Sequence, residues 1–265
     1  MISTTIPQQL NFIAKGNLKG KPLIVTHGWA TDSSFTLPIV DLFSTRKVML
    51  LDLPGYGINS HFANINPYSE EFLAKLHDSL PPHCDILSWS LSSLLAIALC
   101  AYDKRQKIDK LITICGTPRF PADPNWPGFP GHFVLQTKKL FTKERFQKML
   151  RLFYALQCKS AFNSPENNAF IKDAAKKMIV PNFEVLDRGL KSMSDIDLRV
   201  CLKNLPQPCF HLFGEHDNLV PAKQAEYLKR FKHQTFVFKN SGHMPFLTEK
   251  ELFKQIVLRF LNEEK

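Results

Sequence analysis

The sequence lacks any apolar run near the roughly 18 residues that a transmembrane helix needs. Its first residues also lack the basic segment and apolar stretch of a secretory signal. No two cysteines have CxxC spacing, so we expect reduced thiols and not disulfides or metal ligands. The six cysteines are Cys84, Cys100, Cys115, Cys158, Cys201 and Cys209. We therefore expect a cytoplasmic protein with no membrane insertion.

Cofactor motifs and acidic residues are also scarce. Nothing resembles a P-loop, a dinucleotide fingerprint or a metal-ligand cluster, so we expect no cofactor and no metal. The sequence has 34 Lys and Arg against 24 Asp and Glu, a net charge of +10. Such a surplus suits an acidic protein, an anionic membrane or nucleic acid as partner. No recognised nucleic-acid-binding module is present, which argues against the last of these.

What the sequence does contain is short apolar strands that alternate with helices. Hydrophobic residues make up 44% of the 265, enough for a substantial core. We expect strands at 22–26, 47–53, 111–115, 208–213 and 235–238, and one ending at Ile86-Leu87. Helices are expected at 68–80, from Leu91 onward, at 222–230 and at 249–261. This order predicts an α/β fold with a mostly parallel central sheet flanked by helices.

One long segment interrupts that alternation. Residues 119–134 are rich in proline and aromatic side chains, and residues 137–192 have helical spacing throughout. We predict a core formed by 1–118 and 193–265, with 119–192 inserted as a helical lid. Long insertions between strands usually form lids or binding elements.

The segment Ser88-Trp89-Ser90-Leu91-Ser92 lies between an expected strand and an expected helix. It has the pattern of the G-x-S-x-G nucleophile elbow with serine in place of both glycines. A serine at such a turn is presented above the sheet beside free helix N–H groups, as attack on a carbonyl requires. The alternative is a serine-rich helix cap without chemistry. On the first interpretation Ser90 is the nucleophile.

A serine nucleophile needs a base and an acid that orients the base. Asp217 directly follows the expected strand 208–213, and His243 follows the strand 235–238. The order Ser, Asp, His is that of the α/β-hydrolases. Asp217 could instead be only a helix cap and His243 only a loop residue. Asp195 and Asp197 are rival orienting acids, but they precede the strand, so we prefer Asp217.

The oxyanion that forms during attack needs two backbone N–H donors. Trp29 and Leu91 occupy those two positions, and their side chains are expected to shape the pocket. His27 is expected to fix its loop by hydrogen bonding. His211 is expected to be structural, and His216 to lie on the surface.

The chain resembles one family over about residues 22–260. Shared hydrolase motifs are His27-Gly28-Trp29 and Trp89-Ser90-Leu91; more discriminating are Trp126-Pro127-Gly128, residues 153–157 (FYALQ) and residues 185–190 (VLDRGL). These resemble the pimeloyl-[acyl-carrier protein] methyl ester esterases of biotin synthesis. The resemblance implies a serine carboxylesterase that cleaves the methyl ester of a pimeloyl chain held on acyl carrier protein. It further implies Ser90, Asp217 and His243 as triad, and Trp29, Trp89 and Phe153 as substrate contacts.

The sequence departs from that family at the elbow, where the family has Gly-Trp-Ser-Leu-Gly-Gly and this chain has residues 88–93, SWSLSS. The carrier-contacting arginines are only partly kept. Lys148 matches one, and Arg151, Lys172 and Lys176 lie near others. Residues 138–191 hold twelve basic and five acidic side chains, which is +7 of the net charge. Such a surface would attract an acidic carrier, or it is only a solvated face.

Two other functions stay open at this point. A general carboxylesterase acting on small or medium-chain esters would use the same triad. A non-catalytic ligand-binding protein with a hydrolase fold is the other, because the elbow glycines are replaced. A monomer is expected under each.

Overall fold

The computed structural model describes residues 10–129, 137, 139–160 and 164–263. Within that part of the chain, the centre of the molecule is a seven-stranded sheet in the order β1-β3-β2-β4-β5-β6-β7. Only β1 runs antiparallel, pairing with β3, and the remaining neighbours are parallel. The strands are β1 Phe12–Gly16, β2 Pro22–Thr26, β3 Lys47–Leu51, β4 Cys84–Trp89, β5 Ile108–Ile114, β6 Cys209–Gly214 and β7 Gln234–Phe238. The predicted α/β architecture is thereby confirmed.

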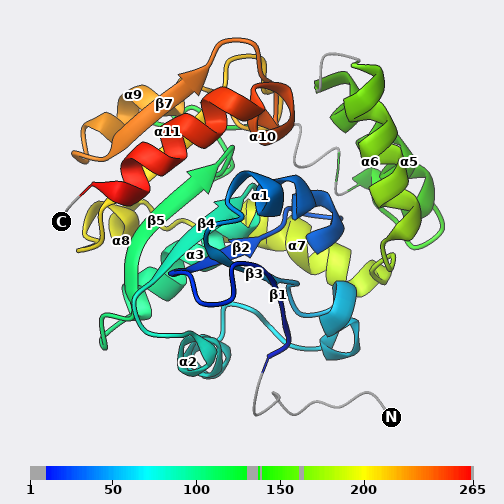
Figure 1. The fold of residues 1–265 in the computed structure, drawn as a ribbon. Helices are drawn as coiled ribbons and strands as arrows, with labels where there is room; N and C mark the ends of the chain where they lie inside the picture. The colour runs from blue at the N-terminus through cyan, green and yellow to red at the C-terminus, as the bar shows by residue number, and fades with distance from the viewer. Residues whose placement is uncertain (1–9, 130–136, 138, 161–163, 264–265) are drawn as a thin grey trace.

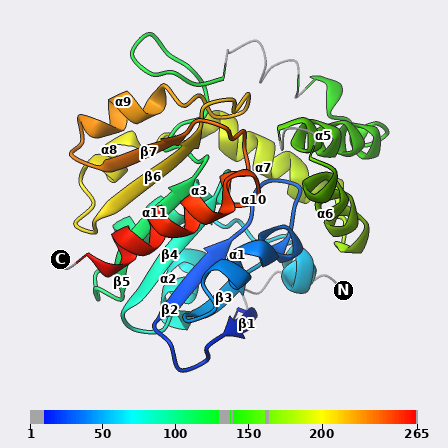
Figure 2. The same ribbon diagram turned by 45° about the horizontal axis from the view of Figure 1, so that its top comes forward.

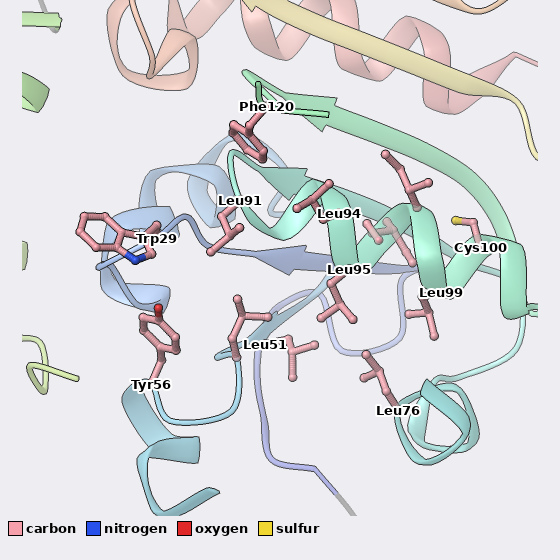
Figure 3. Close-up of a cluster of buried hydrophobic side chains, with 14 of the residues drawn as sticks. Trp29, Leu51, Tyr56, Leu76, Leu91, Leu94, Leu95, Leu99, Cys100 and Phe120 are labelled. Carbon is pink, nitrogen blue, oxygen red and sulfur yellow. The ribbon is translucent and has the colours of Figure 1, made fainter. Parts of the chain in front are cut away.

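Helices cover both faces of the sheet (Figure 1). Successive side chains of a strand point to opposite faces. In β2, Leu23 and Val25 pack with α1 (Leu37–Leu42) and α11 (Lys250–Asn262), while Ile24 packs on the other side. That second face is covered by α2 (Glu70–Ser79), α3 (Ser92–Tyr102), α8 (Arg199–Lys203) and α9 (Gln224–Lys229). Figure 3 shows part of this second core, where leucines of α3 lie against Leu51 and Leu76.

Burial on both faces explains why the parallel strands appear as continuous apolar runs. β4, β5 and β6 are buried at every position. β1 differs, since three of its five residues are exposed and it lies at the sheet edge. A strand of that kind has no continuous apolar run, and the sequence analysis missed it.

The described part of the chain between β5 and β6 includes the helices α5 (Phe146–Ser160), α6 (Pro165–Lys177) and α7 (Phe183–Asp195). α5 and α6 lie side by side in both views, and α6 also contacts the short helix η1 (Ser33–Thr36) (Figures 1 and 2). α7 begins at an Asn182 cap that accepts from Val185 N–H and ends three residues after the expected limit of 192. The division into a core and an inserted lid stays a prediction.

The described helices include none that combines the length and the apolar character needed to cross a bilayer. The remaining short helices complete the connections of the fold. They are η2 (Gly57–Phe62) and α10 (Pro245–Thr248).

Candidate active site

Ser90 lies at the turn between β4 and α3. Its φ of +60° is in the left-handed region, which is uncommon for residues other than glycine. The strand before it and the helix after it hold this conformation, and its own N–H donates to Ile114 O at 2.9 Å. A strained residue at a strand-to-helix turn is the geometry of a nucleophile elbow.

Ser90 is hydrogen bonded to His243, and His243 to Asp217. The distance from His243 Nε2 to Ser90 Oγ is 2.8 Å, and from His243 Nδ1 to Asp217 Oδ2 it is 2.7 Å. All three side chains are at least nine-tenths buried. The structure thus brings together the three residues that the sequence singled out.

Asp217 does not cap the helix that follows it, because the N-cap of α9 is Lys223 and has no side-chain hydrogen bond. Its Oδ1 accepts from the N–H groups of Leu219 at 2.7 Å and Val220 at 3.1 Å. These bonds fix the carboxylate so that Oδ2 faces the imidazole. The rival Asp197 is instead paired with Arg199 and Arg119.

The two expected oxyanion donors are Leu91, which directly follows Ser90, and Trp29, which lies in the loop after β2. That loop is close to the elbow, since a Cβ on Gly28 would lie 3.2 Å from Ser90 Cβ. Within the described part of the chain, neither Trp29 N–H nor Leu91 N–H has an acceptor. His27 holds the loop that carries Trp29, because its Nε2 accepts from Leu53 N–H at 2.9 Å and its Nδ1 lies 2.8 Å from Gly28 O. Nε2 therefore carries no proton, and Nδ1 is the donor to Gly28. His27 is structural, as the sequence predicted.

Tyr154 is a support of the same loop that the sequence analysis did not assign. Its hydroxyl donates to Ala30 O at 2.5 Å, and its ring stacks on Phe35. It lies within the discriminating segment 153–157, which was the available signal. A residue of α5 therefore holds the backbone next to Trp29.

Trp89 has a buried side chain that is hydrogen bonded to the loop of His243. It is 1% exposed, and its Nε1 donates to His243 O at 2.9 Å. The indole therefore holds the backbone of the base in place. The expected contact of Trp89 with substrate stays a prediction.

Trp29 and Phe153 do lie together. The Trp29 ring meets Phe153 edge-on at 5.2 Å and Phe141 at 5.7 Å. Phe153 is partly buried and belongs to α5. An aromatic surface suited to an apolar acyl chain therefore borders the loop that carries Trp29.

The serines that replace the elbow glycines are fully buried and hydrogen bonded. Ser92 Oγ donates to Trp89 O at 3.0 Å and lies 2.7 Å from Thr26 Oγ1. Ser88 Oγ donates more weakly, at 3.4 Å, to Ser93 Oγ. Gly116 supplies the space for Ser93, since a Cβ there would overlap Ser93 Oγ.

Cys115, Asp217 and His243 place one potential ligand atom each within 4.8 Å of one another. Burial, together with the Asp217 charge, raises the pKa of the Cys115 thiol well above its usual range. A raised pKa opposes formation of the thiolate that metals bind. Asp217 and His243 are also bonded to each other. This group does not fit a metal site.

The four expected carrier-docking residues lie exposed on two neighbouring helices. Lys148 and Arg151 belong to α5, and Lys172 and Lys176 to α6. None of the four has an ion pair among the described residues. Their charges are available to a partner.

These features define a class of protein. A family model described as alpha/beta hydrolase fold matches residues 21–250, and the chain belongs to that family. It is similar to the pimeloyl-[acyl-carrier protein] methyl ester esterase of Aliivibrio salmonicida, with 32% identity, covering 93% of this chain and 94% of the relative. For the enzyme of the same name from Vibrio campbellii, identity is 34% and the coverage 89% and 92%. The predicted family resemblance is confirmed.

Solved structures agree on the fold. The hydrolase olei00960 from Oleispira antarctica matches with a TM-score of 0.78 at 18% identity, covering 97% of this chain and 96% of the other. An esterase from Exiguobacterium antarcticum matches with a TM-score of 0.77 at 19% identity, covering 96% and 94%.

Proposed function

We propose that the protein is a serine carboxylesterase that hydrolyses the methyl ester of pimeloyl-[acyl-carrier protein]. The observation that carries the proposal is the hydrogen-bonded series Ser90, His243, Asp217 at a strained elbow. Two relatives named for this reaction align with 93% and 91% of this chain. Freeing the distal carboxylate would produce the biotin precursor.

The reaction begins when Ser90 Oγ attacks the ester carbonyl and its proton passes to His243 Nε2. The carbonyl oxygen becomes an oxyanion that accepts from Trp29 N–H and Leu91 N–H. Collapse breaks the bond to methoxide, which takes the proton from His243 and leaves as methanol. A water then gives its proton to His243 and attacks the acyl-enzyme. Release of Ser90, reprotonated by His243, leaves the free carboxylate.

Asp217 keeps the imidazole in the required tautomer. Its Oδ2 accepts from Nδ1–H, so the unprotonated Nε2 faces Ser90. It also stabilises the imidazolium while the proton is held. The two backbone bonds to its other oxygen keep the carboxylate from turning away.

The lid would bind the carrier. Lys148 and Arg151 lie on α5, the helix that also carries Phe153. An acidic carrier on this face would bring its acyl arm to the Trp29–Phe153 surface. Opposite charges of this kind raise the rate of encounter and orient the partner.

Charge reversal tests that assignment. Lys148→Glu with Arg151→Glu is expected to raise KM for the carrier-bound ester and leave turnover of a small uncharged methyl ester unchanged. A matched control is Lys203→Glu with Lys229→Glu, which makes the same charge change on the exposed α8 and α9. Salt should mimic the lid variant, because the screening length falls from ~10 Å at 0.1 M to ~3 Å at 1 M.

Equal effects of the two variants would mean that the lid charges are only solvated. Cleavage of the free and the carrier-bound methyl ester with equal kcat/KM would instead favour a general carboxylesterase.

A further inference from the structure

Gly189 lies in the middle of α7, where glycine is an unfavourable residue. A Cβ at this position would lie 2.5 Å from Trp29 Cδ1, 2.9 Å from Trp29 Nε1 and 3.3 Å from Leu91 Cδ2. The glycine therefore lets the helix backbone lie directly against these two side chains. Figure 3 shows Trp29 and Leu91 at the same end of the buried cluster.

The same helix also holds the Trp29 indole by a hydrogen bond. Trp29 Nε1 donates to Leu186 O at 2.9 Å, one turn before Gly189. Trp29 is thus fixed at two points by α7, through a backbone carbonyl and through close packing.

α7 is itself anchored on its other side. Arg188 Nη1 donates to Ala63 O and Ile65 O, each at 2.8 Å. Burial lowers the pKa of this half-buried guanidinium, yet it stays charged and bonded. A helix fixed to the core in this way is a rigid support for the indole.

We propose that Gly189 is a positioning residue for both oxyanion donors. It acts by letting α7 fix the side chains of Trp29 and Leu91, whose backbone N–H groups stabilise the transition state. The proposal rests on the proposed function, because it assumes ester cleavage at Ser90. The segment 185–190, which contributes no residue to the triad, then has a role in positioning the oxyanion donors.

Gly189→Ala is the test. Ordinary contact begins at 3.4 Å, so the indole or the helix must move by ~1 Å from a Cβ placed at 2.5 Å. A misplacement of ~1 Å can cost about 100-fold in rate. We expect kcat for a small methyl ester to fall roughly 10- to 100-fold, with KM nearly unchanged. This is less than the ~100- to 1000-fold cost of losing one donor outright.

A trifluoromethyl ketone analogue of the ester gives a readout that a merely structural role would not change. Ser90 adds to its carbonyl, and the resulting oxyanion occupies the oxyanion hole. Its inhibition constant should rise in Gly189→Ala by the same factor by which kcat/KM falls. Lys191→Ala is the control, because Lys191 is an exposed residue of the same helix, and both measures should stay as in the wild type.

Trp29→Ala provides a second route, because a double variant reports on the contact itself. It removes the bond to Leu186 and should lower kcat by itself. It also removes the indole atoms nearest to the new Cβ, so adding Gly189→Ala should cost less in this background than in the wild type. Equal costs would overturn the proposal.

The proposal is also wrong if Gly189→Ala lowers the melting temperature but leaves kcat and the ketone affinity unchanged. The glycine would then serve packing alone. Full turnover by Ser90→Ala would instead refute the proposed function, which is a separate result from a separate variant.

Discussion

Replacing Ser92 by the glycine of the nucleophile-elbow pattern should destabilise this protein. Ser92 is fully buried, and its hydroxyl donates to Trp89 O while lying 2.7 Å from Thr26 Oγ1. Because the Ser92 proton is used at Trp89, Thr26 is the donor to Ser92. Removing Ser92 Oγ leaves the buried Thr26 hydroxyl without its partner.

The magnitude follows from that unpaired group. A buried donor left unsatisfied costs about 1–3 kcal/mol, so we expect a loss of ~2 kcal/mol for Ser92→Ala. Glycine in a helix costs about 0.5–1 kcal/mol more than alanine, which brings Ser92→Gly to ~3 kcal/mol. With an m-value of about 2–3 kcal/mol/M, the urea midpoint should fall by roughly 1 M.

Urea unfolding of three variants gives the assay. Thr26→Val with Ser92→Ala removes both hydroxyls and should recover most of the loss, since replacing both partners by apolar groups is nearly neutral. The reasoning is refuted if Ser92→Gly is as stable as the wild type. It is also refuted if the double variant is no more stable than Ser92→Ala.

Three further predictions follow from the site and the core. Ser90→Ala should fold normally and lose nearly all turnover and all fluorophosphonate labelling; labelling at Ser92 in the wild type would contradict the assignment. Asp217→Asn should keep KM and lower kcat by roughly 10⁴-fold, as measured by steady-state kinetics, because the wrong imidazole tautomer then faces the nucleophile. Burial and the nearby His233 lower the pKa of His211 to about 3, so unfolding takes up a proton below the ordinary histidine pKa of ~6.5. Stability should therefore fall as pH decreases from ~6.5 toward 3, by up to about 1.4 kcal/mol per unit, and unfolding curves of His211→Gln should show a shallower slope.

Much of the fold could be predicted because most of its strands are buried on both faces. Such strands are continuous apolar runs, as at β2, where the expected and observed limits agree at residues 22–26. Helix ends were predicted less well. The expected helix 68–80 begins at Glu70 and ends at Ser79, because the Ser69 side chain accepts from Phe72 N–H and starts the helix there.

The edge strand β1 could not be predicted for a physical reason. Its residues are half-exposed or exposed, and its position is set by pairing with β3, more than thirty residues away. Nothing in its own composition specifies that partner.

The catalytic candidates were predictable because each directly follows a strand. Ser90 follows β4, Asp217 follows β6, and His243 follows β7. Parallel strands bring their carboxyl ends to one edge of the sheet, so three such positions converge. The residues that hold them in place were not predictable, since Tyr154, Gly189 and Trp89 act through contacts between distant parts of the chain.

The elbow shows how local and distant features combine. Each serine at an elbow glycine position has a hydroxyl with a partner nearby. Ser92 pairs with Thr26 of β2, and the single Ser88 proton is shared between Ile112 O of β5 and Ser93 Oγ, each at 3.4 Å. The added volume of Ser93 is offset by Gly116 at the end of β5. The strained φ of Ser90 is therefore maintained by side-chain hydrogen bonds as well as by the close approach of strand and helix. An elbow without glycine can keep the nucleophile geometry where its neighbours supply both the space and the partners.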